Sequence, residues 1–175
     1  LRRSIGPDLA ARFLELGDTV SATRVRDAIL RAPGVVGPQL TLMQAALDMH
    51  EGQAKEAEQK IQSVLNDPGP ASADAMIAMV DAKVSQNLPI DPELAEALAG
   101  LVDENEPESE TSKTTRALIL ARAASGDFGK ALSSTGNFPE LVPTIWRLLA
   151  RLGTNDDVLS HAVLPATAPI PDVDH

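Results

Sequence analysis

Residues 9–22 read Leu9-Ala-Ala-Arg-Phe-Leu-Glu-Leu-Gly-Asp-Thr-Val-Ser-Ala22, and this stretch decides the fold. Its apolar residues recur every three or four positions, as on one face of a helix. They are Leu9, Phe13 and Leu16. After Gly17-Asp18 a second helical stripe runs on to a stop at Pro33-Gly34, through Ala22, Val25 and Ile29. The segment predicts two short helices joined by a tight turn.

The same plan returns at a fixed interval along the chain. Gly17 and Gly52 are 35 residues apart, and so are Ala22 and Ala57 and also Pro33 and Pro68. Gly126 lies 74 residues beyond Gly52, which is two further periods of 37. Gly153 closes a further helical stripe. The pattern predicts about five antiparallel helix hairpins, at about 7–33, 38–68, 72–105, 111–136 and 139–164.

The third hairpin departs from this plan because no glycine marks its turn. It crosses instead through Asn87-Leu-Pro-Ile-Asp-Pro92. Asp91 can cap the helix that follows, and Pro92 suits the first helical position, where a missing N–H costs nothing. Helical spacing of apolar residues prevails nearly everywhere, and no useful window alternates apolar and polar residues as a half-buried strand would. We therefore predict an all-α chain.

A two-helix repeat with a period in the mid-thirties resembles the tetratricopeptide family. Leu9-Ala10, Phe13, Gly17-Asp18 and Ala22 fall where that repeat places its apolar pair, its large residue, its turn and its small second-helix residue. Gly126-Asp-Phe-Gly-Lys-Ala131 is the clearest copy of the turn. The first-helix tryptophan of the family is absent from the expected places. The resemblance implies a right-handed α-α superhelix over residues 1–164.

Composition excludes several classes of protein. The 175 residues carry a net charge of −10, with one Trp, three Phe and no Cys. Acidity and scarce aromatic residues argue against nucleic-acid binding, and the apolar runs are too short to cross a membrane. A chain without cysteine fits either the cytoplasm or the periplasm. Because it begins at Leu1 without a methionine, we expect it to be a segment of a longer protein.

The negative charge is local. Residues 1–34 carry a net +2, residues 35–110 a net −12, and residues 111–175 are neutral. Five acids within residues 103–110 predict a solvated, mobile loop between the third and fourth hairpins. Residues 165–175 are rich in proline and predict an extended tail outside the fold.

The chain lacks the motifs of catalysis and of metal or nucleotide binding. His50-Glu51 begins like a zinc-protease helix, but Ala54 stands where the second histidine is needed. Gly126 to Lys130 has two residues between its glycines where a phosphate loop has four, and Ala131 replaces the hydroxyl residue. We find no signature of a serine nucleophile. We predict no enzymatic activity, no metal and no cofactor.

A stack of hairpins lines a concave groove with its first helices. The candidate groove residues are Gln39, His50, Lys113, Arg116, Arg147 and Arg151, together with Leu42 and Met49. The lysine and the three arginines could receive a carboxylate or an acidic peptide. Alternatively, they pair with nearby acids or simply solvate a face. For Trp146 we expect a role in core packing rather than in ligand stacking.

The sequence thus predicts a protein-interaction or scaffold module that binds a protein or peptide through this groove. Two alternatives remain open. The chain could be a helical accessory domain of a larger enzyme, or a structural element for homo-oligomerisation.

Overall fold

The computed structural model describes residues 9–10, 12–14, 16–31, 37–67, 69, 71–102 and 108–153. All regular secondary structure within these ranges is helical, so the all-α prediction is confirmed for this part of the chain. Residues 9–10 and 12–14 are helical and precede the first labelled helix. The elements are α2 (Thr19–Leu30), α3 (Pro38–His50), α4 (Ala54–Leu65), α5 (Ser72–Ser85), α6 (Pro92–Ala99), α7 (Glu108–Ala124), α8 (Phe128–Ser133), η1 (Thr135–Asn137), η2 (Pro139–Leu141) and α9 (Val142–Leu152).

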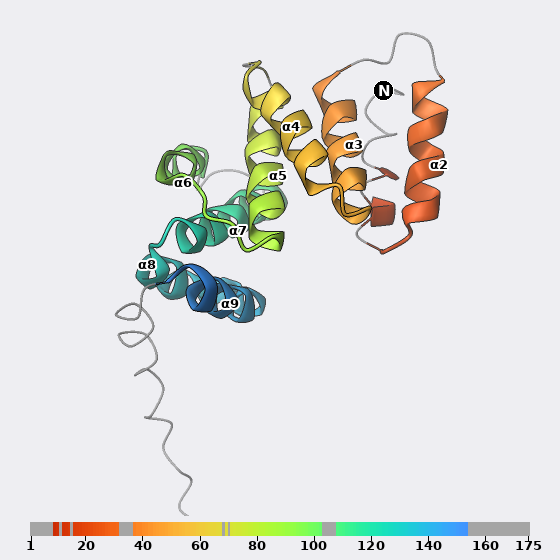
Figure 1. The fold of residues 1–175 in the computed structure, drawn as a ribbon. Helices are drawn as coiled ribbons and strands as arrows, with labels where there is room; N and C mark the ends of the chain where they lie inside the picture. Colours follow the sequence, from red (N-terminus) through yellow and green to blue (C-terminus); the bar gives the residue numbers. More distant parts are fainter. Residues whose placement is uncertain are drawn as a thin grey trace, which may run out of the picture.

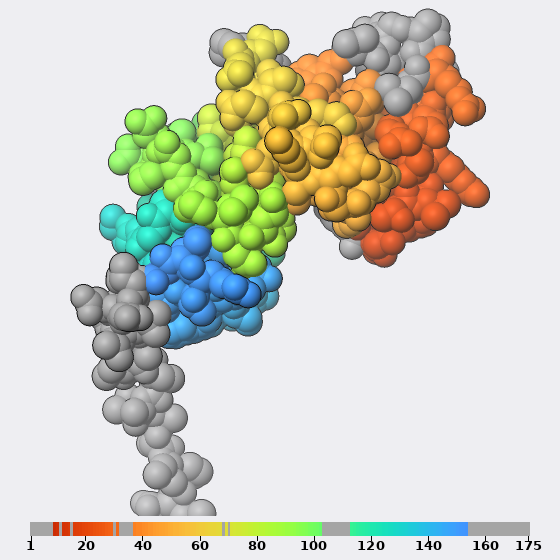
Figure 2. Space-filling model, viewed as in Figure 1, coloured from red at the N-terminus to blue at the C-terminus, as the bar shows by residue number. Residues whose placement is uncertain are grey.

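The helices pack mainly against near neighbours in the chain. From α2 to α9, each α-helix contacts the next one. In addition α3 contacts α5, α5 contacts α7, and α7 contacts α9. Figure 1 shows α2 to α5 side by side, with α7 and α9 at the α5 end of this row and running across the direction of α5, and Figure 2 shows the resulting elongated, bent body.

Tight reversals with left-handed backbone end several of the helices. Gly17, Gly52 and Gly126 have φ of 74°, 79° and 96°. At the second of them the N–H of Gly52 donates to the carbonyl of Met49 at 3.2 Å, and the N–H of Gln53 donates to that of Asp48 at 2.7 Å. This paired bonding is the Schellman motif, which satisfies the last carbonyls of a helix. The glycine turns predicted from the repeat are therefore present.

Small residues follow these turns at the places where the two helices of a hairpin meet. Ala22, Ala57 and Ala131 each lie five residues after the turn glycine, and each is fully buried. A larger side chain would push the helices apart, because protein interiors are close-packed. The period of 35 residues therefore reflects a repeated contact.

The third turn has no glycine, and Asn87 takes its place. It lies 35 residues after Gly52 and has a φ of 54°. The N–H of Leu88 donates to the carbonyl of Lys83 at 2.9 Å, as in the glycine turns. Asparagine tolerates left-handed backbone better than most residues do. After three more residues Asp91 caps α6 by accepting from the N–H of Glu93 at 3.0 Å, as predicted.

The largest core cluster lies towards the C-terminal end of the described chain. It joins residues of α5 to α9, whereas two much smaller clusters join the first helical residues to α2 and α3. Fully buried members include Leu98, Ile119, Ile145, Leu148 and Leu149. Trp146 is half-buried against this cluster, which agrees with its predicted packing role.

One segment boundary predicted from the sequence differs in the structure, and others lie outside the described residues. Helix α7 begins at Glu108, so the last three residues of the predicted acidic loop are helical. Residues 103–107, the second half of the fifth hairpin and the tail at 165–175 lie outside the described residues. Within those residues no helix is long and apolar enough to cross a membrane.

Replacing Gly52 by alanine should lower the free energy of unfolding by about 1 kcal/mol, because an L side chain is strained in left-handed backbone. A Cβ at Gly52 would meet no atom within 4 Å, so the backbone alone sets this cost. Gly136 is a matched control, because it also has open space but no positive φ. Urea unfolding followed by far-UV circular dichroism should show a loss for Gly52→Ala and none for Gly136→Ala. Equal values would contradict the proposed strain.

Replacing Asn87 by glycine should raise the free energy of unfolding by about 0.5 to 1 kcal/mol. Its Oδ1 is buried and has no hydrogen-bond partner in the described part of the chain, and its backbone is left-handed. Glycine removes both costs, whereas Asn87→Ala removes only the unpaired oxygen. Urea unfolding should therefore rank glycine above both alanine and the native asparagine. A glycine variant less stable than the native chain would contradict this account.

Candidate interaction groove

A hollow of about 880 Å³ lies between the C-terminal halves of α3 and α5. Most of the side chains that line it are aliphatic. They are Leu14, Leu42, Ala46, Met49, His50, Ala54, Ile61, Ala78, Asp81, Ala82, Ser85 and Gln86, with Gly52 at the turn after α3. We call this hollow the α3/α5 groove.

The repeat of the sequence explains why these two helices form the groove together. Ala46 and Asp81 are 35 residues apart, and so are His50 and Ser85. Equivalent positions on α3 and α5 therefore face the same hollow. Small residues such as Ala46 and Ala78 leave room between the helices, while the longer Leu42 and Met49 contribute apolar walls.

Asp81 is the one acidic residue among the described residues that line the groove. It is exposed to water, and no hydrogen bond or ion pair holds its carboxylate within the described part of the chain. Although the residue as a whole is exposed, the apolar atoms packed around its carboxyl displace water from it and raise its pKa to about 6, and the charge of Arg116 only partly offsets this. Because the folded pKa lies above the ordinary value of 3.8, ionisation of Asp81 lowers stability as the pH rises between these two values.

Arg116 acts on Asp81 through its charge, but its ion pair is with another residue. Its guanidinium donates to the carboxylate of Glu140, at the η2 turn, at 2.5 Å, and both side chains are about half exposed. Charges thus alternate from Asp81 on α5, through Arg116 on α7, to Glu140 on η2. This pairing matches the alternative interpretation of Arg116, in which it pairs with a nearby acid.

The other predicted groove residues are placed as follows. His50 ends α3, is exposed, and lines the groove together with Leu42 and Met49, as expected. Four more are exposed on α3, α7 and α9 and lie outside the lining described above. They are Gln39, Lys113, Arg147 and Arg151. The structure therefore joins one of the six candidates, His50, to the α3/α5 groove.

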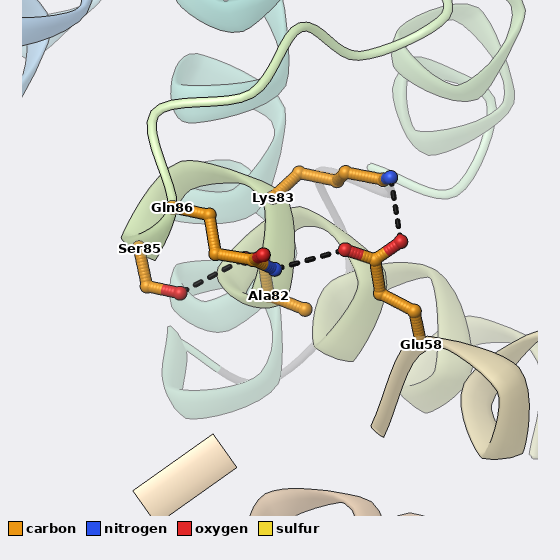
Figure 3. Close-up of polar contacts among 5 residues, drawn as sticks. All are labelled: Glu58, Ala82, Lys83, Ser85 and Gln86. Atoms are coloured by element: carbon orange, nitrogen blue, oxygen red, sulfur yellow. Dashed lines mark hydrogen bonds and ion pairs between the residues drawn. The ribbon is translucent and has the colours of Figure 1, made fainter. Parts of the chain in front are cut away.

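A polar cluster ties the helix behind the groove to α5 (Figure 3). Glu58 on α4 accepts from Lys83 Nζ at 2.7 Å and from Gln86 Nε2 at 2.8 Å. Burial acts to raise the pKa of Glu58, but the hydrogen bonds from Lys83 and Gln86 together hold it below its usual value. A second ion pair, between Lys60 and Asp48, ties α4 to α3. These contacts fix α3 and α5 to the same intervening helix and so fix the two walls of the groove.

A second hollow of about 580 Å³ lies between α4, α5 and the start of α6. Its charged lining includes Glu58 and Lys83, which already bind each other. It is therefore a weaker candidate for binding than the α3/α5 groove.

No match was found when the chain was compared with protein-family models, with curated proteins and with solved structures. Among the described residues, no group of three or more His, Asp or Glu residues is placed to hold a metal ion. The chemistry of this chain therefore has to be argued from its own geometry.

Replacing Glu58 by alanine should lower the free energy of unfolding by about 1.5 kcal/mol at neutral pH, because two hydrogen bonds to a charged group are lost. The pKa of Glu58 is lowered by folding, so its contribution is present above the unfolded pKa and disappears as the pH falls through the folded pKa. Urea unfolding at pH 7 and pH 3 should show a gap that closes in acid.

Glu56→Ala is the matched control for Glu58→Ala, because Glu56 lies on the same helix and is exposed. It should change stability by less than about 0.5 kcal/mol. A similar loss in both variants would show that the polar cluster contributes nothing specific.

Proposed function

We propose that this chain is a protein-interaction module that binds a segment of a partner protein in the α3/α5 groove. We further propose that the groove belongs to a right-handed superhelix of about five hairpins, similar to tetratricopeptide repeats. In this arrangement α3, α5, α7 and α9 are the first helices of successive hairpins and line the concave face. The contacts of α3 with α5, α5 with α7 and α7 with α9 support it.

The observation that carries the proposed function is the apolar lining of an open groove. Leu42, Met49 and Ala78 are only partly buried, although all three contribute to its walls. Contiguous apolar surface rimmed by polar residues marks sites of interaction. The volume of about 880 Å³ falls near the upper end of the roughly 300 to 1,000 Å³ typical of binding pockets.

The rigidity of the walls supports binding without a folding step. Glu58 holds α5 and Asp48 holds Lys60 of α4, so the helices on both sides of the groove are already fixed. A preformed site spares the partner the cost of ordering the groove. The proposed mechanism is passive recognition, with no chemical step.

The test begins with a random dodecapeptide library screened against the immobilised chain, followed by fluorescence anisotropy on the selected peptides. Ala78→Trp fills the groove and should weaken binding at least tenfold, a loss of about 1.4 kcal/mol. Ala97→Trp is the matched control, because Ala97 is exposed on α6 and lies outside the groove lining. It should leave binding unchanged.

Two results would contradict the proposed function. One is a set of selected peptides that bind the native chain and the Ala78→Trp variant equally well. The other is a screen that yields no peptide with a dissociation constant below about 1 mM. Far-UV circular dichroism of both tryptophan variants shows whether each remains folded.

A further inference from the structure

We propose that the α3/α5 groove recognises a segment that presents one lysine or arginine between aliphatic residues, with the cationic group against the carboxylate of Asp81. This inference rests on the proposed function and names the chemistry of the partner. It differs from the acidic partner that the sequence suggested.

The position of Asp81 is the first argument. It lies in a mostly aliphatic lining, with Ala78 and Ala82 of its own helix and Leu42 and Ala46 of α3. No hydrogen bond or ion pair within the described residues satisfies it. A lysine or arginine is suited to such a site, because its long stem packs on apolar surface while its head group reaches the charge.

The distribution of charge is the second argument. Residues 38–85, which span α3 to α5, carry seven acidic residues and three lysines, a net −4. Such a field attracts a cationic segment and repels an acidic one. Arg116 was predicted to bind an acidic group, and its charge acts on Asp81 of this groove. It already forms an ion pair with Glu140. An acidic partner would have to displace Glu140 and approach Asp81 at the same time.

The charged and polar groups around Asp81 determine whether a cation bound there would be repelled. His50 of α3 lines the same groove, and Arg116 of α7 acts on Asp81 through its charge. From α4 the lining residues are Ala54 and Ile61, which are uncharged, and Ser85 and Gln86 are polar neighbours at the end of α5. Arg116 is shared with Glu140, so Asp81 remains available.

The dependence on pH gives the inference a second signature. Burial keeps the pKa of Asp81 near 6, so acidification below that value protonates the free groove and removes the attraction. Binding of a cationic segment should therefore weaken between pH 7 and pH 5. A His50→Gln variant removes the other ionisable side chain that lines the groove, so that any dependence on pH that remains can be assigned to Asp81.

The experiment uses three labelled synthetic dodecapeptides of leucine, alanine and serine that differ only at one central position. That position is lysine, norleucine or glutamate, where norleucine keeps the aliphatic stem of lysine without its charge. By anisotropy at pH 7.5 the lysine peptide should bind the native chain about tenfold more tightly than the norleucine peptide, as expected for a charged hydrogen bond. The glutamate peptide should bind most weakly.

Variants of the full chain test whether Asp81 causes this preference. Asp81→Asn should abolish the advantage of lysine over norleucine. Asp74→Asn is the matched control, because Asp74 lies on the same helix, is exposed and is outside the groove lining. It should keep the advantage. In the His50→Gln variant the advantage should still decrease from pH 7 to pH 5, and in Asp81→Asn it should show no such decrease.

The outcomes separate this inference from the proposed function. If all three peptides bind alike and Ala78→Trp abolishes that binding, the groove binds partners but recognition of a cation is wrong. The inference is also overturned if the glutamate peptide binds best, or if library peptides bind the groove while these three do not. If neither the library peptides nor these three bind, both proposals fail.

Discussion

The left-handed residue that ends four of the described helical segments is the constraint on which the rest of this fold depends. At Gly17, Gly52, Asn87 and Gly126 the chain leaves a helix, satisfies its last carbonyls and turns back within a few residues. After the three glycine turns the returning helix crosses close to the one before it, and the buried alanines Ala22, Ala57 and Ala131 make this approach possible. Because the same contact recurs, equivalent positions of α3 and α5 come to face one hollow.

Much of this arrangement could be predicted from the sequence, because turns and close helix contacts impose residue types at fixed intervals. Glycine at positive φ and alanine at a crossing point are strong local signals, and they located the hairpins. Asn87 was overlooked because asparagine occupies many environments, although adding 35 to Gly52 identifies it. The start of α7 at Glu108 was missed because an acidic run favours both a solvated loop and the first turn of a helix.

The groove was harder to predict than the fold. His50, Leu42 and Met49 were recognised from their places on the first helix of a repeat, and the structure sets them around the hollow. Asp81 was not recognised, although it lies one period after Ala46. An isolated acid on a helix is usually a solvated residue, and only the packing of α3 against α5 surrounds it with apolar walls. The partners of Arg116 could not be predicted either, because the pairing with Glu140 joins two different helices.

The uneven distribution of buried residues has a consequence for how the chain comes apart. Its main core joins α5 to α9, and a second cluster joins α3, α4 and α5, while only two small clusters hold the first helical residues and α2 to α3. The N-terminal end should therefore fray first, since local opening is easiest where few apolar contacts are lost. Leu14, one of the first helical residues, lines the groove together with α5, so the groove spans the weakly held N-terminal end and the well-anchored part of the chain. A molecule bound in the groove would contact both parts and hold them together. Its binding would therefore protect the amides of the N-terminal helices from hydrogen exchange with solvent.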